Sequence, residues 1–259
     1  MVDIAVVPVG HGPLKVIAVH GWMAGRRLFD PVHAHLNLDD FSYAFMDCRG
    51  YGDQIDSPGP FTVRTIAEDV VQLADSLGWE QFTVLGHSMA GMSAQWLVHL
   101  VPNRIKSIVL LSTVPASGAV ITSERRALLE LAIADPYARR TLIDINTGQR
   151  RSVSWLNQTL AISLETTSPE SLRSYLLSWT QDDLTPELQR STKPLMVIVG
   201  QADPGATMEV MLQNVLPLYV NGHSLMLDGV GHYAMSEDPV ALVRAMEKFI
   251  SEQATPAVP

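Results

Sequence analysis

The length, composition and charge of the chain exclude several classes of protein before any motif is considered. The chain has 259 residues, of which 47% are hydrophobic, enough to bury the core of one large domain or of a domain with an inserted part. It carries 27 acidic and 18 basic residues, which gives a formal charge of −9. An acidic surface repels nucleic acid and anionic membranes, so we expect neither as a partner.

The cysteine content and the N-terminal residues favour a cytoplasmic protein. Cys48 is the only cysteine, so the fold cannot rely on an internal disulfide, and this fits a reducing compartment. Residues Met1–Ile4 lack the basic segment and the long apolar stretch that begin a secretory signal. No stretch reaches the ~18 consecutive apolar residues typical of a membrane span. The sequence leaves open whether the chain is a monomer or a homodimer.

Short runs of β-branched and other apolar residues alternate with longer segments of helical spacing along most of the chain. The predicted strands are Lys15–His20, Tyr43–Asp47, Phe82–Leu85, Ile105–Leu111, Leu195–Gly200 and His223–Leu227, with Asp3–Val9 as a candidate edge strand. The predicted helices among them are Val63–Leu77, Met89–Leu100 and Val240–Ile250. Nearly continuous apolar strands that alternate with helices indicate a parallel α/β sheet that is buried on both faces.

One region, residues 115–193, breaks this alternation because it contains helix signatures and no convincing strand. Ser123 can cap one helix, Pro136 opens a second, and Ser168 can cap another. We interpret this region as a helical lid inserted between two strands. The predicted organisation is a first core segment (residues 1–114), the lid (residues 115–193) and a second core segment (residues 194–259).

The clearest chemical signal is a serine on a predicted strand-to-helix turn. Ser88 lies in the segment Gly86-His87-Ser88-Met89-Ala90-Gly91, between a predicted strand and a predicted helix. A sharp turn of this kind exposes the serine oxygen at a helix N-terminus, where backbone N–H groups favour developing negative charge. The usual pattern is Gly-x-Ser-x-Gly, and Ala90 replaces its last glycine with a residue that is still small. The structural alternative is a glycine-rich turn without chemistry.

A nucleophilic serine needs a base, and eight histidines compete for this role. His232 is the best placed, because it follows the predicted strand His223–Leu227 in a loop at the carboxyl edge of the sheet, where ligands bind in such folds. The neighbouring Gly229 and Gly231 allow the backbone to approach the site closely. His87 adjoins the serine but is expected to point elsewhere.

The base in turn needs a carboxylate to orient it. Asp203 follows the predicted strand Leu195–Gly200, and the chain order Ser88, Asp203, His232 is the one expected for a serine on a strand-to-helix turn. The competing loop, Ser112–Pro115, contains no carboxylate. The alternative role for Asp203 is the N-cap of a helix that Thr207 could equally cap.

The oxyanion of a tetrahedral intermediate needs two hydrogen-bond donors. The backbone N–H of Met89 is expected to be the first, because Met89 follows the nucleophile. The second is expected from the loop after the strand Lys15–His20, where Trp22 is the candidate. Only the backbone of Trp22 would act as a donor, so its side chain can also pack or contact the substrate. We expect His20 to brace this loop rather than to take part in chemistry.

Together these segments resemble the α/β-hydrolase superfamily over nearly the whole chain. The segments that carry the resemblance are His20-Gly21-Trp22, Asp47-Cys48-Arg49-Gly50-Tyr51-Gly52, Gly86-His87-Ser88-Met89-Ala90-Gly91, Gly200-Gln201-Ala202-Asp203 and Gly231-His232. The resemblance implies a mostly parallel, roughly eight-stranded sheet with helices on both faces and a helical lid after the sixth strand. Serine at position 88 argues against relatives that use an aspartate nucleophile, such as haloalkane dehalogenases and epoxide hydrolases.

The predicted function is that of a serine hydrolase that cleaves an ester or lactone of a hydrophobic small molecule through an acyl-enzyme. No metal or other cofactor is expected, because the sequence contains no metal-ligand cluster. The candidate substrate-binding residues are Trp22 and four aromatic residues of the lid: Tyr137, Trp155, Tyr175 and Trp179. The four lid residues could equally pack the lid on itself.

Two other functions stay open at this stage. A cofactor-independent ring-cleaving dioxygenase or a carbon–carbon bond hydrolase would use the same scaffold, and the segments His20-Gly21-Trp22 and Arg49-Gly50-Tyr51-Gly52 also resemble those dioxygenases. A non-enzymatic receptor for a small ligand is the other alternative, because a fold alone does not fix a function. A complete Ser-His-Asp set argues against the receptor.

Overall fold

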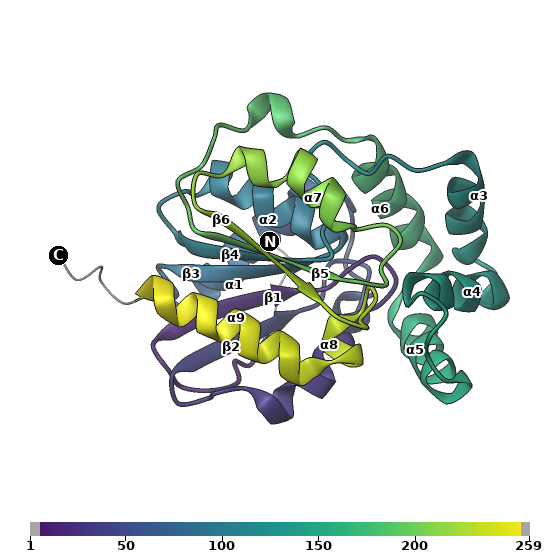
Figure 1. The fold of residues 1–259 in the computed structure, drawn as a ribbon, viewed down its shortest axis with the longest axis horizontal. Coiled ribbons are helices and arrows are strands. Elements are labelled where there is room, and N and C mark those ends of the chain that lie inside the picture. Colours follow the sequence, from purple (N-terminus) through teal and green to yellow (C-terminus); the bar gives the residue numbers. More distant parts are fainter. Residues whose placement is uncertain (1–5, 255–259) are drawn as a thin grey trace.

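Six strands form one parallel sheet in the computed structural model, which describes residues 6–254 (Figure 1). The strands are β1 (Leu14–Val19), β2 (Phe41–Met46), β3 (Phe82–His87), β4 (Ile105–Leu111), β5 (Leu195–Gly200) and β6 (Gly222–Leu227). Their spatial order is β2-β1-β3-β4-β5-β6, and every neighbouring pair is parallel. The six main strands predicted from the sequence are confirmed, with ends that differ by at most two residues.

The sheet has fewer strands in the described part of the chain than the eight or so that the resemblance implies. Of the candidate edge strand Asp3–Val9, residues 3–5 lie outside the described residues. Val9 makes only an isolated antiparallel bridge to Tyr43, with both N···O distances 2.8 Å. Pro8 has no N–H to donate, and Gly10 turns the chain at a φ of +89°, so the pairing stops at this bridge.

Helices cover both faces of the sheet. Outside residues 115–193 they are α1 (Val63–Ser76), α2 (Met89–Leu100), α7 (Met208–Asn214), α8 (Ala234–Glu237) and α9 (Pro239–Ala254). Short 3-10 segments are η1 (Arg26–His35), η2 (Gly52–Gln54) and η4 (Leu216–Leu218). Helices α1 and α2 pack against each other on one face, and η1 and α9 pack together on the other (Figure 1).

The amphipathic stripe of α1 shows how the sequence directs a helix onto the sheet. Thr62 caps the helix by accepting a hydrogen bond from the Thr65 N–H, and Gly78 follows its end at a φ of +65°. The buried apolar residues of the helix are Val63, Ile66, Ala67, Val70, Leu73 and Ala74. Their spacing of three and four residues places them on one face.

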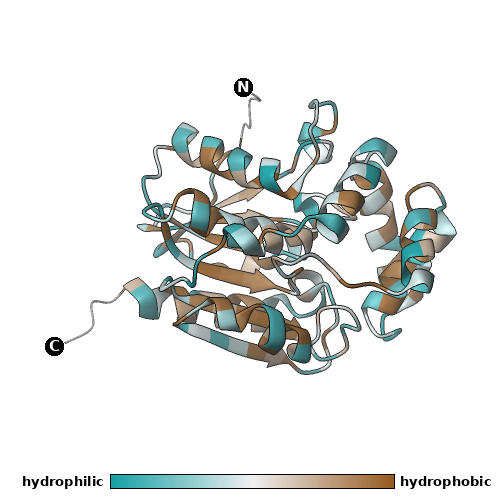
Figure 2. Cartoon of the chain, turned by 90° about the horizontal axis from the view of Figure 1, so that it is seen from above, coloured by the Kyte–Doolittle hydropathy of each residue, from teal (hydrophilic) through white to brown (hydrophobic). Residues whose placement is uncertain are grey.

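The core lies along the strands, where the hydrophobic colour is concentrated in Figure 2. Every residue of β2 and β3 is buried, whereas three of the six residues of β6 are exposed. Burial along the whole length of a strand agrees with the nearly continuous apolar runs in the sequence. Within residues 6–254, no helix combines the length and the apolar character needed to cross a membrane.

Strand register brings three loops to one edge of the sheet. Val19 of β1 lies beside Gly86 of β3, and His87 lies beside Leu111 of β4. Because the strands are parallel, the loops that follow them leave the sheet on the same side. The segments that contain Trp22 and Ser88 are therefore neighbours in space although 66 positions separate them in the sequence.

Four helices lie between β4 and β5, at one end of the sheet (Figure 1). They are α3 (Ser123–Ala132), α4 (Pro136–Asn146), α5 (Val153–Thr166) and α6 (Pro169–Gln181), and the 3-10 turn η3 (Thr185–Glu187) follows them. We call residues 115–193 the helical insertion. Each of its four helices begins at a side-chain cap, in the order Thr122, Asp135, Ser152 and Ser168. The expected cap Ser123 is instead the first residue of α3, because Thr122 accepts the capping hydrogen bond.

A buried arginine of α4 completes the carboxyl end of α3. The Arg139 guanidinium donates to the carbonyls of Ala132 at 2.8 Å and Ile133 at 2.7 Å, and to the Thr167 hydroxyl at 3.0 Å. The residue is only 3% exposed. Backbone carbonyls at a helix carboxyl end carry partial negative charge, so they stabilise this cation, with which no carboxylate of residues 6–254 pairs.

Replacing this arginine should loosen the insertion and not the sheet. Arg139→Met leaves the two carbonyls without donors, and each lost donor costs roughly 1–3 kcal/mol. We expect hydrogen exchange, followed by mass spectrometry, to become faster in α3 and α4 while β1–β4 keep their protection. Arg140→Met is the matched control, because Arg140 is the next residue of α4 and makes an exposed hydrogen bond to Asn157. Equal protection of α3 in both variants would contradict this role.

Candidate active site

Ser88 lies on the turn between β3 and α2 in a backbone conformation that residues other than glycine rarely adopt. Its φ is 55° and its ψ is −118°, and such a conformation costs roughly 1–3 kcal/mol. The neighbouring strand holds the turn in place. The Ser88 N–H donates to the Leu111 carbonyl at 2.9 Å, and the Ser88 carbonyl accepts from the N–H groups of Gly91 and Val114, each at 3.0 Å.

Two glycines make the close packing of this turn possible. A Cβ at Gly86 would lie 2.6 Å from the Ala90 carbonyl oxygen, and a Cβ at Gly91 would lie 1.9 Å from the Thr113 hydroxyl oxygen. The methyl group of Ala90 is accommodated in the core, where the residue is 1% exposed. The structure thus explains the departure from Gly-x-Ser-x-Gly, because the position that tolerates no side chain is Gly91 rather than Ala90.

His232 and Asp203 come together, as the sequence predicts. The Nδ1 atom of His232 lies 2.6 Å from Oδ2 of Asp203, whose other carboxylate oxygen accepts from the N–H groups of Gly205 (2.9 Å) and Ala206 (3.1 Å). Burial by itself would raise the pKa of Asp203. The nearby charge of His232 and these three hydrogen bonds outweigh burial, so the pKa of Asp203 is lowered and its carboxylate stays ionised.

The alternative role of Asp203 as a helix cap does not apply to α7. Thr207 is the N-cap of this helix and its hydroxyl accepts from the Val210 N–H at 3.3 Å. The Asp203 carboxylate is therefore free to accept hydrogen bonds from His232 Nδ1–H and from the backbone N–H groups of Gly205 and Ala206. The loop Ser112–Pro115 supplies no carboxylate to compete with it.

A buried glutamate that the sequence analysis did not single out fixes the His232 loop. The carboxylate of Glu237 accepts from the N–H groups of Gly231 and Tyr233, each at 2.9 Å, and pairs with Arg151 at 2.7 Å. These N–H groups flank His232 on both sides. Glu237 therefore holds the backbone around the histidine, and its place at the end of a short helix gave no sign of this role.

The loop after β1 packs directly against the serine. A Cβ at Gly21 would lie 2.9 Å from the Ser88 Cβ, so only glycine fits at that position. Trp22 is held on two sides: its indole Nε1 donates to the Leu172 carbonyl at 2.8 Å, and its own carbonyl accepts from the Tyr51 hydroxyl. Met89 is the first residue of α2, and N–H groups in the first turn of a helix have no partner within the helix.

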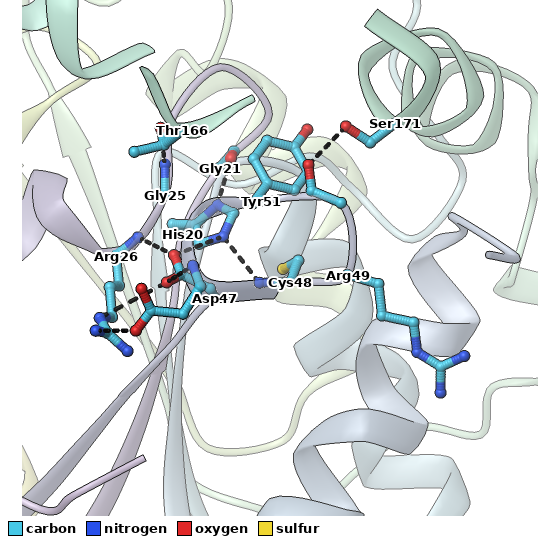
Figure 3. A network of polar contacts seen from close by, with 12 residues as sticks. His20, Gly21, Gly25, Arg26, Asp47, Cys48, Arg49, Tyr51, Thr166 and Ser171 are labelled. Carbon is cyan, nitrogen blue, oxygen red and sulfur yellow. Dashed lines mark hydrogen bonds and ion pairs between the residues drawn. The ribbon is translucent and has the colours of Figure 1, made fainter. Parts of the chain in front are cut away.

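His20 braces this loop in its neutral form (Figure 3). The Cys48 N–H donates to its Nε2 at 3.0 Å, so the ring proton must be on Nδ1, which donates to the Gly21 carbonyl at 2.8 Å. Asp47 Oδ1 lies 3.8 Å from Nε2. Burial lowers the pKa of His20 although the charge of Asp47 raises it, and the occupied Nε2 agrees with a neutral ring.

Asp47 accepts hydrogen bonds from the backbone of two turns near the site. Its Oδ1 accepts from the Arg26 N–H at 2.7 Å and its Oδ2 from the Asp53 N–H at 3.1 Å. A Cβ at Gly52 would lie 2.3 Å from Oδ2. The Asp-x-Arg-Gly-x-Gly segment is therefore part of the scaffold around the site, with Asp47 bonded to the Arg26 backbone (Figure 3), and Gly52 makes room for the carboxylate.

His87 lies closer to the site than the sequence analysis expected. Its ring centroid is 4.9 Å from that of His232, and its Nε2 donates to the His232 carbonyl at 3.0 Å. The residue is 1% exposed and lines the cavity beside Ser88. Burial and the neighbouring His232 lower the pKa of His87 well below its usual range, so the ring is neutral. Only its position beside Ser88 could have indicated this contact.

A cavity of about 830 Å³ lies between the sheet edge and the helical insertion. The loops after β1, β3, β4, β5 and β6 contribute Trp22, Ser88, Ser112, Pro204 and His232, respectively. The insertion contributes residues that include Ile121, Leu129, Leu142 and Trp179. Among the described residues, no cluster of histidine, cysteine and acidic side chains is arranged to hold a metal ion.

The structure corrects three of the expected substrate-binding residues, which do not line this cavity. Tyr137 is 84% exposed on the outer side of α4. Trp155 packs against the Tyr233 ring at a centroid distance of 6.0 Å. Tyr175 is fully buried, and its hydroxyl donates to the Arg49 carbonyl at 3.2 Å. Trp22 and Trp179 do line the cavity, with their rings 5.9 Å apart.

Comparison with known proteins identifies the family. The sequence profile described as alpha/beta hydrolase fold matches residues 16–168, which is more than half of the chain and includes the Ser88 turn. The chain belongs to the alpha/beta hydrolase fold family. The resemblance seen in the sequence segments is thereby confirmed.

Relatives of this hydrolase-fold chain include lactonases and esterases. It is 28% identical over 214 residues to 3-oxoadipate enol-lactonase 2 of Acinetobacter baylyi, a match that covers 81% of this chain and 78% of that protein. The enol-lactonase from Burkholderia xenovorans LB400 superposes with a TM-score of 0.83 at 20% identity over 96% of both chains. An esterase from Exiguobacterium antarcticum gives a TM-score of 0.82 at 20% identity, covering 96% of this chain and 95% of that one.

The packing of the Ser88 turn predicts losses of stability of different size at two adjacent positions. Gly91→Ala places a methyl group against Thr113, and overpacking of this kind costs typically about 1–3 kcal/mol. Ala90→Gly removes only a helix-favouring methyl, which costs roughly 1 kcal/mol or less. Urea unfolding should therefore show the larger loss of stability for Gly91→Ala. A larger loss for Ala90→Gly would show that the motif position, and not Gly91, limits the packing.

The buried neutral ring of His87 makes stability depend on pH. Its folded-state pKa lies well below the ordinary value of about 6.5, so the unfolded chain binds the proton more readily. The contribution to stability is complete above about pH 6.5 and is lost as the pH falls towards the folded-state pKa, by up to about 1.4 kcal/mol per pH unit. His87→Gln should weaken this pH dependence in urea unfolding between about pH 7.5 and 5. His35→Gln, at an exposed position, should keep the wild-type slope.

Proposed function

We propose that this protein hydrolyses carboxylic esters or lactones, with Ser88 as the nucleophile, His232 as the base and Asp203 as the orienting acid. The observation that carries the proposal is the 2.6 Å contact between His232 Nδ1 and Asp203 Oδ2 beside a cavity that both Ser88 and His232 line. Family membership and relatives that include an enol-lactonase add support. The positive φ of Ser88 is a further feature of a serine presented on a sharp turn.

Acylation begins with transfer of the Ser88 hydroxyl proton. Because Asp203 engages Nδ1 of His232, Nε2 is the ring nitrogen that is left to accept this proton. The serine oxygen forms a bond to the substrate carbonyl carbon as the carbonyl π electrons move onto oxygen. The intermediate then collapses, the bond to the leaving alkoxide breaks, and His232 Nε2–H returns its proton to that oxygen. A lactone opens in the same step and keeps its alcohol attached to the acyl group.

Deacylation repeats these transfers with water. His232 takes a proton from the water molecule, whose oxygen attacks the acyl carbon, and collapse of the second intermediate returns Ser88 with its proton and releases a carboxylic acid. The ionised Asp203 stabilises the imidazolium that forms in both steps. Its low pKa keeps the carboxylate available for this over the neutral pH range.

The oxyanion is assigned to the backbone N–H groups of Met89 and Trp22. Met89 supplies an N–H from the first turn of α2, where the helix dipole favours negative charge. Trp22 is held by Leu172 and Tyr51, and Gly21 brings its loop against Ser88. Donors fixed in this way need no reorganisation as the charge develops, which is the main source of electrostatic catalysis.

The proposed substrate is a small molecule with an apolar part. We infer that the insertion acts as a lid, because its Leu129, Leu142 and Trp179 line the same cavity as Ser88, and apolar side chains there would exclude water from the acyl group. A cavity of this size takes a molecule of ordinary metabolite dimensions. The 3-oxoadipate enol-lactonase among the relatives makes lactones the first ring substrates to test.

Loss of the nucleophile should abolish hydrolysis. A panel of para-nitrophenyl esters, alkyl esters and lactones should be assayed against wild type and Ser88→Ala, for which we expect kcat to fall by ~10⁴-fold or more. A fluorophosphonate should label the folded wild type at Ser88. Ser154→Ala, at an exposed position of α5, is the control and should keep wild-type rates.

Three results would point away from this function. Near-normal hydrolysis by Ser88→Ala would exclude the serine as nucleophile. Oxygen uptake with a heteroaromatic substrate that survives this substitution would favour the cofactor-independent dioxygenase. Failure of the fluorophosphonate to react, together with tight binding of a small ligand and no turnover, would favour the receptor.

A further inference from the structure

One permanent charge faces the otherwise uncharged cavity. Of the described residues that line the cavity, Arg125 is the only one with a permanent charge, and no aspartate, glutamate or lysine joins it there. The remaining lining groups are mostly apolar side chains and small alcohols, together with His87 and His232. A cation in such surroundings is poorly solvated and attracts an anion more strongly than it would at the surface.

The guanidinium of Arg125 lacks a balancing carboxylate in the described part of the chain. Its one side-chain hydrogen bond goes from Nη2 to Oδ1 of Asn146, a neutral acceptor. Other arginines near the cavity are satisfied: Arg151 pairs with Glu237, and Arg139 donates to several carbonyl and hydroxyl oxygens. A guanidinium carries five N–H donors, so most of those of Arg125 remain for a ligand.

The position of Arg125 in its helix is unfavourable for stability. It lies in the first turn of α3, directly after Ser123 and Glu124, where the positive end of the helix dipole repels a cation. Burial also lowers its pKa, although the nearby Tyr233 and Asp203 partly offset this effect. Arg125 therefore has an unfavourable position in its helix and no carboxylate partner among the described residues. A residue that lowers stability in this way is usually retained for function.

Asn146 fixes Arg125 relative to the candidate base. The Asn146 amide accepts from Arg125 through Oδ1 and donates through Nδ2 to the Tyr233 hydroxyl at 3.3 Å. Its backbone carbonyl accepts from the His232 N–H at 2.9 Å. A Cβ at Gly231 would lie 2.7 Å from that carbonyl oxygen, so glycine allows this approach. One residue therefore sets the place of the cation with respect to His232.

We propose that Arg125 binds a carboxylate of the substrate, so that the preferred substrates are esters or lactones that carry a free carboxylate away from the scissile carbonyl. This inference rests on the proposed function, because it concerns the specificity of the same site. The carboxylate accepts hydrogen bonds from the free guanidinium N–H groups while the apolar chain of the substrate contacts Leu129 and Leu142. Arg125 stays protonated throughout and exchanges no proton with the substrate.

The test compares pairs of substrates that differ only in charge. Para-nitrophenyl monoesters of linear dicarboxylic acids are matched with para-nitrophenyl esters of monocarboxylic acids of equal chain length, and spontaneous hydrolysis is subtracted. The readout is the ratio of kcat/KM for the charged ester to kcat/KM for the neutral ester. A merely structural role of Arg125 would change both values alike and leave this ratio unaltered.

We expect wild type to prefer the charged ester and Arg125→Met to lose this preference by roughly 10- to 150-fold. That range corresponds to the ~1.5–3 kcal/mol of a hydrogen bond to a charged group, at about 1.4 kcal/mol for each factor of ten. Most of the loss should appear in KM. Arg125→Lys should restore part of the preference, because it keeps the charge without the planar donor set. Arg126→Met is the matched control, since Arg126 is the next residue and does not line the cavity.

The outcomes separate this inference from the proposed function. Hydrolysis of neither ester class, or full hydrolysis by Ser88→Ala, would overturn the function itself. Hydrolysis that requires Ser88 but shows no preference for the charged ester in wild type would overturn the inference alone. This second comparison needs no Arg125 variant, so it holds even if Arg125→Met fails to fold. If Arg125→Met lowered kcat/KM equally for both esters, the inference would be wrong, and the role of Arg125 would be to hold Asn146 in place.

Discussion

The backbone of Ser88 is the constraint on which the rest of the site depends. A residue at a φ of 55° relaxes unless its neighbours hold it, and here three backbone hydrogen bonds connect it to β4, the loop after β4 and α2. Close packing at Gly86 and Gly91 leaves that turn no room to open. The parallel sheet then brings the loops that carry Trp22, Asp203 and His232 to the same edge.

Two buried neutral histidines support this edge in different ways. His20 joins the backbone of Cys48 to that of Gly21, so it ties the loop after β2 to the loop after β1. His87 donates to the backbone of His232 and so ties β3 to the loop after β6. In each case burial keeps the ring uncharged, and the backbone carbonyl to which the ring donates fixes which nitrogen carries the proton. Neither ring therefore adds charge to the site.

The sequence predicted the sheet and the loops well because both follow from local patterns. Continuous apolar runs identify strands buried on both faces, and residues that follow such strands must meet at one edge. The orientation of side chains on the insertion could not be obtained in this way. Tyr175 and Trp179 lie four positions apart on α6, yet only Trp179 reaches the cavity, because the tilt and rotation of the helix decide which side chain faces inward. Arg125 and Asn146 belong to different helices, so no spacing in the sequence connects them.

The contacts between the insertion and the two site loops also limit how a substrate can enter. His232 N–H is bound to the Asn146 carbonyl, the Trp22 indole to the Leu172 carbonyl, and the Gly25 N–H to the Thr166 hydroxyl. Movement of the whole insertion away from the sheet would break all three and release the loops that position the reaction. We therefore expect the insertion and the sheet edge to move together, and not the insertion to swing open as a rigid unit. A substrate that enters through small displacements of single side chains would leave the three hydrogen bonds intact. An insertion transplanted from a relative would function only if it brought hydrogen-bond acceptors to the places of the Asn146 carbonyl, the Leu172 carbonyl and the Thr166 hydroxyl.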